Sequence, residues 1–138
     1  MIGQEARDFI EGIPKNEPYF LYVPFNAPHS PLQAKESDLA KYPHREGRPR
    51  IHAAMVDSMD QAIGTILEAA EQRGDLDDTF VLFFSDNGGV NNVASNGELR
   101  GAKASVYQGG IRVAAAAMWK NGGIVGGKRI RERMGYID

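Results

Sequence analysis

No cysteine occurs among the 138 residues of the chain. This absence excludes disulfide bonds, thiolate metal sites and a cysteine nucleophile within the chain. It leaves the cellular compartment open, because a cysteine-free segment is compatible with any redox environment. Long apolar runs are also missing: the longest, residues 113–119, has the length of a strand and falls short of the roughly 18 residues of a membrane helix. The sequence therefore predicts no membrane span.

An excess of charge of one sign is missing as well. The chain has 16 basic and 18 acidic residues and a formal net charge of −2, which excludes nucleic-acid binding driven by a broad basic field. The basic cluster at residues 128–133 contains an acid and no aromatic residue, so we expect a solvated helix or turn face there. Residues 1–5 show neither the basic nor the apolar region of a signal peptide, and none is predicted in this chain.

What the chain does contain is the balance of a globular domain, with 42% hydrophobic and 25% charged residues. Apolar residues at helical spacing predict helices over residues 5–13 and 51–73. Gly74 stands where a left-handed C-terminal cap is expected. Between the two helices, residues 26–50 are expected to form a long polar loop, interrupted by a short helical turn near residues 37–41.

Two continuous apolar and aromatic segments predict strands. Residues 19–25 and 80–84 have the composition of strands that are covered on both faces, as in a parallel sheet, and residues 112–119 predict a third strand. The order strand, helix, strand predicts a βαβ unit with a right-handed crossover. We therefore expect a single α/β domain over residues 1–138, with mostly parallel strands packed by helices.

Polar residues follow each of the first two predicted strands directly. His29 lies in a proline-containing loop after the first strand, and residues 85–89 (Ser-Asp-Asn-Gly-Gly, called the 85–89 run below) follow the second. Ligands bind outside the carboxyl ends of the strands in open α/β sheets. Topology alone therefore predicts that His29 and Asp86 lie at the same edge of the sheet.

The 85–89 run has two interpretations. Asp86 and Asn87 offer a carboxylate and an amide oxygen, the hard ligands that calcium and magnesium prefer, while Gly88 and Gly89 permit a tight backbone. The same four residues are also strong turn formers. Two adjacent oxygen ligands are too few to hold a divalent ion, so a metal site here requires further ligands.

Three basic side chains also have two interpretations each, as a functional group or as an ordinary surface residue. His29, in its stiff loop, is a candidate acid, base or anion donor, or an ordinary exposed histidine. Lys103 follows a glycine and an alanine that would let it approach an anion closely, although this pattern by itself favours a plain surface lysine. Arg112, which follows two glycines and an isoleucine, carries the same two interpretations.

Five stretches of the sequence, taken in order, resemble the motifs of a known protein family. They are residues 18–32, residues 53–64, residues 79–89, residues 99–103 and residues 109–113. Together they resemble the strand and substrate-histidine loop, the central helix, the metal-binding strand end and the substrate-lysine segment of the type I sulfatases of the alkaline-phosphatase superfamily. The resemblance implies a partial alkaline-phosphatase-like sheet and a sulfuric-ester hydrolase of the arylsulfatase kind, acting on a sulfated small molecule or glycan.

The resemblance also implies roles for four residues. Asp86 and Asn87 would be ligands of a calcium ion, with Asp86 also placed as a base toward the nucleophile. His29 would contact the ester and assist the leaving group, and Lys103 would bind sulfate oxygens. A divalent cation, a lysine and an imidazolium would stabilise the negative charge that develops as the ester breaks.

Departures from the family pattern limit what this chain can do. The family's nucleophile is a formylglycine made from a Cys or Ser in a Cys/Ser-x-Pro/Ala-x-Arg motif, and no such motif occurs here. The two further aspartates of the calcium site and the lysine and histidine beside the nucleophile are also absent, and Ala114 stands where the family usually has proline. We therefore expect this chain to be the central part of a catalytic domain, without the N-terminal nucleophile region and the C-terminal region. We also expect the chain to be inactive when it is alone.

Two alternatives remain open. One is a phosphodiesterase or phosphonate hydrolase of the same superfamily, although the 85–89 run with Lys103 favours a sulfatase. The other is a non-catalytic, truncated remnant that binds anions or protein partners. Because neighbouring strands are missing, we expect uncovered sheet edges and homo-oligomers. The family is often periplasmic, secreted or lysosomal, and the compartment of this chain stays unknown.

Overall fold

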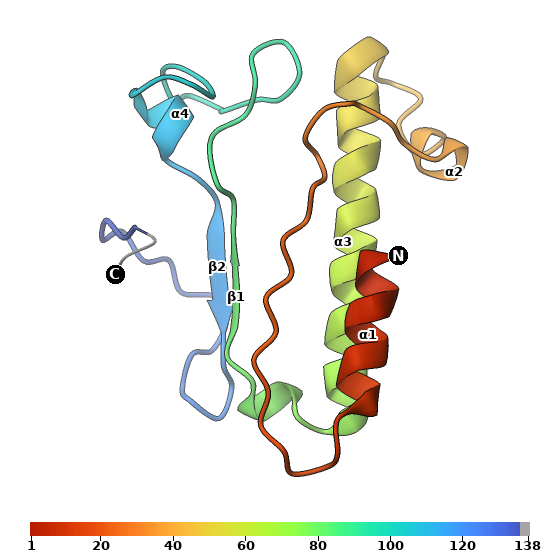
Figure 1. The fold of residues 1–138 in the computed structure, drawn as a ribbon. Coiled ribbons are helices and arrows are strands. Elements are labelled where there is room, and N and C mark those ends of the chain that lie inside the picture. Colours follow the sequence, from red (N-terminus) through yellow and green to blue (C-terminus); the bar gives the residue numbers. More distant parts are fainter. Residues whose placement is uncertain (136–138) are drawn as a thin grey trace.

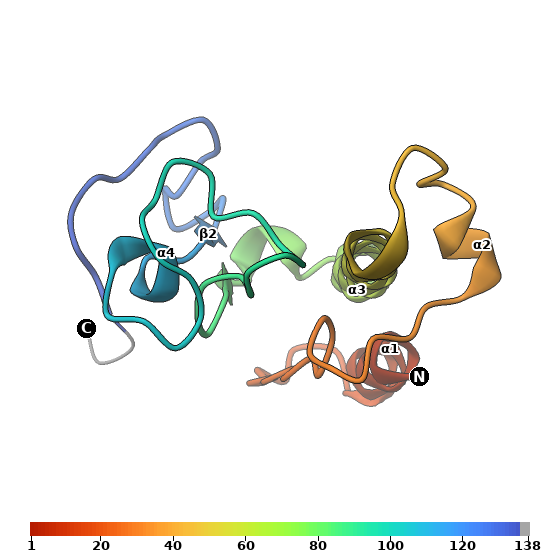
Figure 2. The ribbon, with the colours of Figure 1, turned by 90° about the horizontal axis from the view of Figure 1, so that it is seen from above.

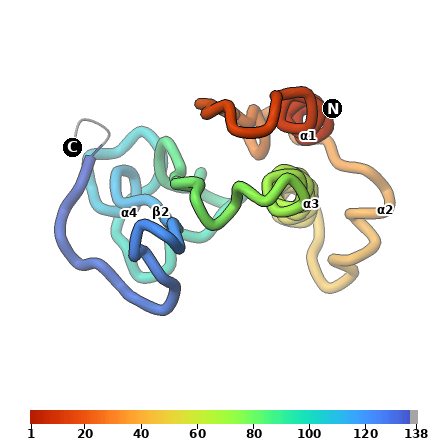
Figure 3. Tube along the Cα trace, turned by 90° about the horizontal axis from the view of Figure 1, so that it is seen from below, coloured from red at the N-terminus to blue at the C-terminus, as the bar shows by residue number. Residues whose placement is uncertain are grey.

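The computed structural model describes residues 1–135 of the chain. In order, its elements are α1 (Ile2–Gly12), α2 (Glu36–Leu39), α3 (Gly47–Arg73), η1 (Leu76–Asp78), β1 (Val81–Phe84), α4 (Gln108–Ile111) and β2 (Ala115–Met118). Figure 1 shows the helices α1 and α3 side by side on one side of the molecule and the two strands on the other. The views along α3 in Figures 2 and 3 show the same separation.

Both long helices are confirmed, with shifted starts. α3 begins at Gly47, four residues before the predicted start, and Pro49 lies in its first turn. Proline is tolerated there because the first N–H groups of a helix have no intrahelical partner. α3 ends as predicted at Gly74, whose φ of 91° is left-handed and whose N–H bonds to the carbonyls of Ala70 and Glu71.

The buried core lies mainly between α1 and α3. Ile10 on α1 is the largest fully buried side chain, and Ala6 of α1 and Ala69 and Ala70 of α3 are also buried. Gly3 permits a close approach of the helices, since a Cβ at this position would lie 2.9 Å from the Cβ of Ala62. Small residues at the contact thus bring the two helix backbones together.

Arg73 fastens the end of α1 to the end of α3. Its Nη1 donates to the carbonyls of Ile10 (3.1 Å) and Ile13 (3.0 Å), and its Nη2 donates to that of Pro14 (2.8 Å). The guanidinium also lies over the ring of Tyr19, 5.5 Å from its centroid. These contacts hold the residues that follow α1, up to Tyr19, against the C-terminal end of α3.

The sheet differs from the one expected. β1 pairs with β2, and the pairing is antiparallel, with Val81 opposite Met118 and Phe84 opposite Ala115. The expected parallel pair does not form within the described part of the chain, where residues 19–25 make no strand ladder. Figure 1 nevertheless shows residues 19–25 and β1 running in the same direction, with α3 running the opposite way. The apolar pattern of the sequence predicts the alternating directions of these segments, but it does not predict which strands become neighbours.

The expectation that both segments are covered on two faces is wrong for this chain. Along residues 19–25 exposure alternates: Phe20 is 89% and Tyr22 70% exposed, while the odd-numbered residues are half-buried. This period of two is that of a strand with one open face. Leu82 on β1 is also exposed, and within residues 1–135 no Cα atom of the two strands lies within 8 Å of a Cα atom of α1 or α3.

The long loop after residue 25 is held against α3 through α2, which confirms the predicted helical turn. Asp38 on α2 is buried and accepts a hydrogen bond from Gln61 of α3 (3.1 Å). Lys41 bonds to Asp57 of α3 (2.7 Å), and Tyr42 donates to the same carboxylate (3.1 Å). The loop that carries His29 is therefore anchored at its far end.

The C-terminal part of the chain is exposed. Residues 128–133 are solvated as expected, although they form no helix. No helix within residues 1–135 has both the length and the apolar character needed to cross a bilayer.

Candidate functional site

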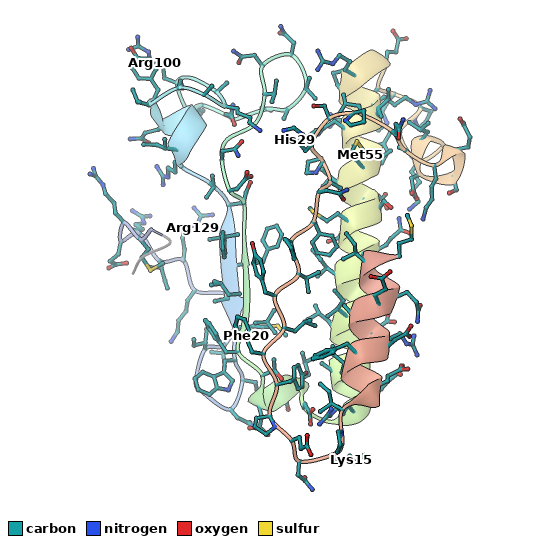
Figure 4. All side chains as sticks on the ribbon, in the orientation of Figure 1. Lys15, Phe20, His29, Met55, Arg100 and Arg129 are labelled. Carbon is teal, nitrogen blue, oxygen red and sulfur yellow. The ribbon has the colours of Figure 1, made fainter. Side chains whose placement is uncertain are left out.

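The candidate site lies at the end of the molecule where the chain leaves β1. The 85–89 run begins there, α4 lies beside it, and the loop with His29 reaches the same end (Figures 1 and 4). This is the edge that topology predicted from the carboxyl ends of the two segments. Among residues 1–135, however, no hydrogen bond joins His29 to residues 85–103.

The 85–89 run continues the strand by one residue and then turns. Ser85 N–H donates to the carbonyl of Ala114 (3.0 Å), and the Ser85 hydroxyl donates to the carbonyl of Asn87 (3.0 Å). The amide of Asn87 donates to the carboxylate of Asp86, which is exposed. The chain thus bends at Asp86 and Asn87, which places the two candidate ligand side chains next to each other.

Close packing, rather than a left-handed backbone, explains the two glycines of this run. Gly88 N–H donates to the carbonyl of Gly110 (2.9 Å), and a Cβ at Gly88 would overlap the carbonyl of Gly109. A Cβ at Gly89 would lie 2.7 Å from the Cβ of Ala94. The run is therefore pressed against α4 and against the loop at Ala94, at distances that leave no room for a Cβ.

Lys103 is joined to the 85–89 run through the backbone. Its N–H donates to the carbonyl of Gly89 (3.0 Å). Asn96 contributes to the same junction: its Oδ1 accepts from Gly89 N–H (2.7 Å), and its Nδ2 donates to the carbonyls of Gly89 (3.1 Å) and Gly101 (3.3 Å). The sequence alone did not single out Asn96, whose one signal was its place in a loop between two motifs.

His29 has one ring nitrogen engaged by the backbone. Its Nδ1 lies 2.9 Å from the carbonyl oxygen of Ser30, and its backbone N–H donates to the carbonyl of Asn26 (3.0 Å). A carbonyl only accepts, so Nδ1 carries the proton and Nε2 is the atom that can take up a second one. The side chain is exposed, as a residue that meets a substrate must be.

Two arginines near the site have local partners. Arg100 stacks on Tyr107, 3.9 Å from the ring centroid, and donates to its hydroxyl (3.0 Å). Arg112, a candidate anion ligand from the sequence, is exposed and donates to the side chain of Gln108 (3.3 Å). Both arginines thus make contacts to α4 or to the residue that precedes it.

The donors of the 85–89 run fit calcium in kind but not in number. The Asp86 carboxylate and the Asn87 amide oxygen are hard ligands, yet calcium takes about six to eight oxygens. No group of three or more His, Cys, Asp or Glu residues that could hold a metal occurs in residues 1–135. A calcium site at this position would need more oxygen ligands than the two side chains of the 85–89 run offer.

The chain matches known proteins along nearly its whole length. A family model described as Sulfatase matches residues 2–134. The chain is similar to N-acetylgalactosamine-6-sulfatase of Homo sapiens, with 34% identity over 139 residues that cover 97% of this chain and 25% of the relative. It is also similar to arylsulfatase J of Mus musculus, with 33% identity over 130 residues that cover 91% and 22%.

A solved structure shows the same likeness. The crystal structure of Ps i-CgsB in complex with k-i-k-neocarrahexaose has a TM-score of 0.81 and 36% identity to this chain, covering 86% of this chain and 27% of that one. The chain thus spans about a quarter of the length of the relatives that it matches.

Proposed function

The chain belongs to the sulfatase family, and we propose that residues 1–138 form the central part of a catalytic domain whose whole polypeptide hydrolyses sulfate esters. The proposal includes the family's alkaline-phosphatase-like α/β fold, in which residues 19–25 and β1 would belong to one mostly parallel sheet. One observation carries the functional proposal: Lys103 is hydrogen-bonded through its backbone to Gly89, which closely follows Asp86 and Asn87. This bond supports the proposal because it joins the backbone that carries the Lys103 side chain to the backbone that carries the proposed calcium ligands.

Each candidate residue has a role that its chemistry supports. Asp86 and Asn87 would hold a calcium ion, which supplies positive charge beside the ester when bound. The Lys103 ammonium would pair with sulfate oxygens and orient the ester. His29, with Nδ1 engaged by Ser30, would deliver a proton from Nε2 to the departing alcohol oxygen.

The nucleophile lies outside this chain in our proposal, since residues 1–138 contain no Cys and no motif that would yield formylglycine. Asp86 would then serve as the base toward that nucleophile as well as a metal ligand. The substrate class follows from the relatives: one is named for an N-acetylgalactosamine 6-sulfate, and one structure holds a neocarrahexaose. We propose a sulfated small molecule or glycan.

The test is an assay of the full-length polypeptide on aryl sulfate and on phosphate and phosphonate esters. Lys103→Ala and His29→Ala should each lower kcat/KM for the aryl sulfate by about 100-fold or more, because each removes a group that stabilises developing charge. Lys120→Ala, which removes a lysine paired with Asp77, is the control and should leave kcat/KM unchanged. Preferential turnover of phosphate or phosphonate esters would favour the alternative function.

The chain alone should show no turnover of aryl sulfate, even with added calcium. It lacks the nucleophile and the ligands that would complete the metal site. The measurement is release of the aryl alcohol by the purified 138-residue chain. Hydrolysis that disappears in the His29→Ala variant would contradict this proposal and would show that residues 1–138 contain a nucleophile of their own.

A further inference from the structure

The side chain of Asn96 binds the backbone of Gly89 in the way a neighbouring strand would. Its Oδ1 accepts from the N–H of Gly89 and its Nδ2 donates to the carbonyl of the same residue, at 2.7 and 3.1 Å. A third bond from Nδ2 reaches the carbonyl of Gly101 (3.3 Å). An amide has both a donor and an acceptor in one plane, so Asn and Gln are the uncharged side chains able to make this reciprocal pair.

The three bonds join two functional segments. Gly89 ends the run that carries Asp86 and Asn87, and Gly101 lies two residues before Lys103. The carbonyl of Gly89 also accepts the N–H of Lys103, at 3.0 Å. The Asn96 side chain therefore spans the junction between the proposed metal ligands and the proposed sulfate ligand.

Among the described residues, the hydrogen bonds that join the loop of residues 90–99 to other segments all involve the Asn96 side chain. The backbone hydrogen bonds of the loop are local: Val93 and Ala94 donate to the carbonyl of Val90, and Leu99 donates to that of Asn96. Packing adds to the constraint, because a Cβ at Gly89 would already lie 3.2 Å from the Oδ1 of Asn96. Without the amide, the loop keeps its local turns and its packing at Val93 and Ala94 but loses its hydrogen bonds to Gly89 and Gly101.

We propose that Asn96 is a positioning residue, which sets the distance between the ligand pair Asp86–Asn87 and the Lys103 side chain. It touches neither metal nor substrate and acts through the backbone of Gly89 and Gly101. Its effect on catalysis rests on the proposed function, whereas its effect on the backbone junction does not. The proposed calcium ion and the Lys103 ammonium would have to contact the same sulfate group, so the distance between them must be fixed. Small displacements of reacting groups lower the reaction rate.

The first experiment measures the junction directly in the full-length polypeptide. Hydrogen exchange, followed by mass spectrometry, reports on peptides that cover Gly89 and Lys103. Asn96→Ala should speed exchange at both amides by about tenfold, the effect of about one lost hydrogen bond. Asn96→Asp keeps the acceptor for Gly89 N–H and should speed exchange only at Lys103. Asn91→Ala, which removes an exposed amide from the same loop, is the control and should change neither.

The second experiment measures the consequence for the reaction. Asn96→Ala should lower kcat for aryl sulfate by about 10- to 100-fold, and it should change KM less. Its melting temperature should equal that of the Asn91→Ala control. Asn96→Asp places an acceptor oxygen opposite the carbonyls of Gly89 and Gly101 and should lose at least as much activity as Asn96→Ala. These results would separate a displaced Lys103 from general unfolding, which would lower the melting temperature as well.

The two experiments fail independently. Unchanged exchange at Lys103 in Asn96→Ala would overturn the positioning role, whatever the enzyme hydrolyses. Faster exchange with an unchanged kcat would overturn its importance for the reaction. An unsubstituted enzyme without sulfatase activity would overturn the proposed function, and the exchange rates would still decide whether Asn96 holds the junction.

Discussion

At the scale of single residues, Gly88 shows how little space the candidate site leaves. Its N–H bonds to the carbonyl of Gly110, and its Cα faces the carbonyl of Gly109 so closely that a methyl group has no room. The neighbouring atoms belong to the backbone, which cannot swing aside as a flexible side chain can. The contact therefore depends on a residue without a Cβ at position 88.

Gly88→Ala should destabilise the chain by about 1–3 kcal/mol, the usual range for overpacking a well-packed position. The measurement is the urea midpoint of unfolding. Gly64→Ala is a matched control, because a Cβ at this position of α3 would have no atom within 4 Å. That control should be stabilising by roughly 1 kcal/mol, the helix preference of alanine over glycine. Equal effects of the two substitutions would contradict the packing argument.

The sequence indicated that glycine is needed at positions 88 and 89, and the structure agrees but gives a different physical reason for it. The sequence suggested glycine for a tight backbone, and the structure shows glycine where the chain presses against α4 and against the loop at Ala94. Asn96 illustrates the converse. One asparagine in an Asn- and Gly-rich loop provides no signal, since its importance depends on which backbone groups the fold brings within reach.

At the scale of elements, α3 carries the pH sensitivity that the structure indicates most clearly. His52 lies in the second turn of this helix and is partly buried. Burial lowers the pKa of His52 below its ordinary value, and the nearby Arg45 lowers it further. The folded state therefore binds the proton less readily than the unfolded state does.

The chain should lose stability as the pH falls below about 6.5, the ordinary histidine value, and continue to lose it through the lowered pKa of folded His52. Above that window the contribution of His52 is constant. The measurement is the urea midpoint between pH 8 and about 5. His52→Gln should flatten the dependence in this window, and Arg45→Gln should flatten it less, since burial is the larger cause. An unchanged slope in His52→Gln would contradict this assignment.

The carboxylate of Asp57 anchors the loop of α2 to the same helix. A hydrogen bond from Lys41 and a less important one from Gln61 hold the pKa of Asp57 below its usual value. The same hydrogen bond to Asp57 raises the pKa of Lys41. The sequence predicted both the loop and its helical turn. It did not predict this attachment, because Lys41 and Asp57 are 16 residues apart and meet only once α3 is folded.

At the scale of the whole molecule, the open faces of residues 19–25 and of the sheet are the main feature. Phe20, Tyr22 and Leu82 expose large apolar side chains, and the strands lie apart from α1 and α3 in the part of the chain that the structure describes. Such surfaces normally pack against further protein. In the longer polypeptides that the chain resembles, about three quarters of the length lies outside the matched region.

We expect the isolated chain to self-associate through these faces. Sedimentation velocity should show species larger than the 15.1 kDa monomer at micromolar concentration. The double variant Phe20→Ser, Tyr22→Ser should shift the distribution toward monomer, because it removes two strongly exposed aromatic side chains. Ile130→Ser with Met134→Ser, two exposed residues of the C-terminal part, is the control and should leave the distribution unchanged. A stable monomer of the unsubstituted chain would contradict the expectation.

Local chemistry and order along the chain were sufficient for several features of this protein. Helical spacing predicted α1 and α3, Gly74 predicted the end of α3, and the five ordered motifs indicated the sulfatase family. These features depend only on near neighbours or on a linear pattern, so they are present in the sequence before any folding. The position of the 85–89 run at a strand end belongs to the same class.

Other features depend on long-range contact and emerged only from the folded chain. The fold pairs β1 with β2 in antiparallel fashion, leaves residues 19–25 without a ladder partner in the described chain, and joins Lys103 to the 85–89 run. The physical reason is that an apolar pattern reflects burial and direction, whereas neighbours are chosen by the competition of all segments for the same hydrogen bonds. The contacts of Asn96 exist only through that choice.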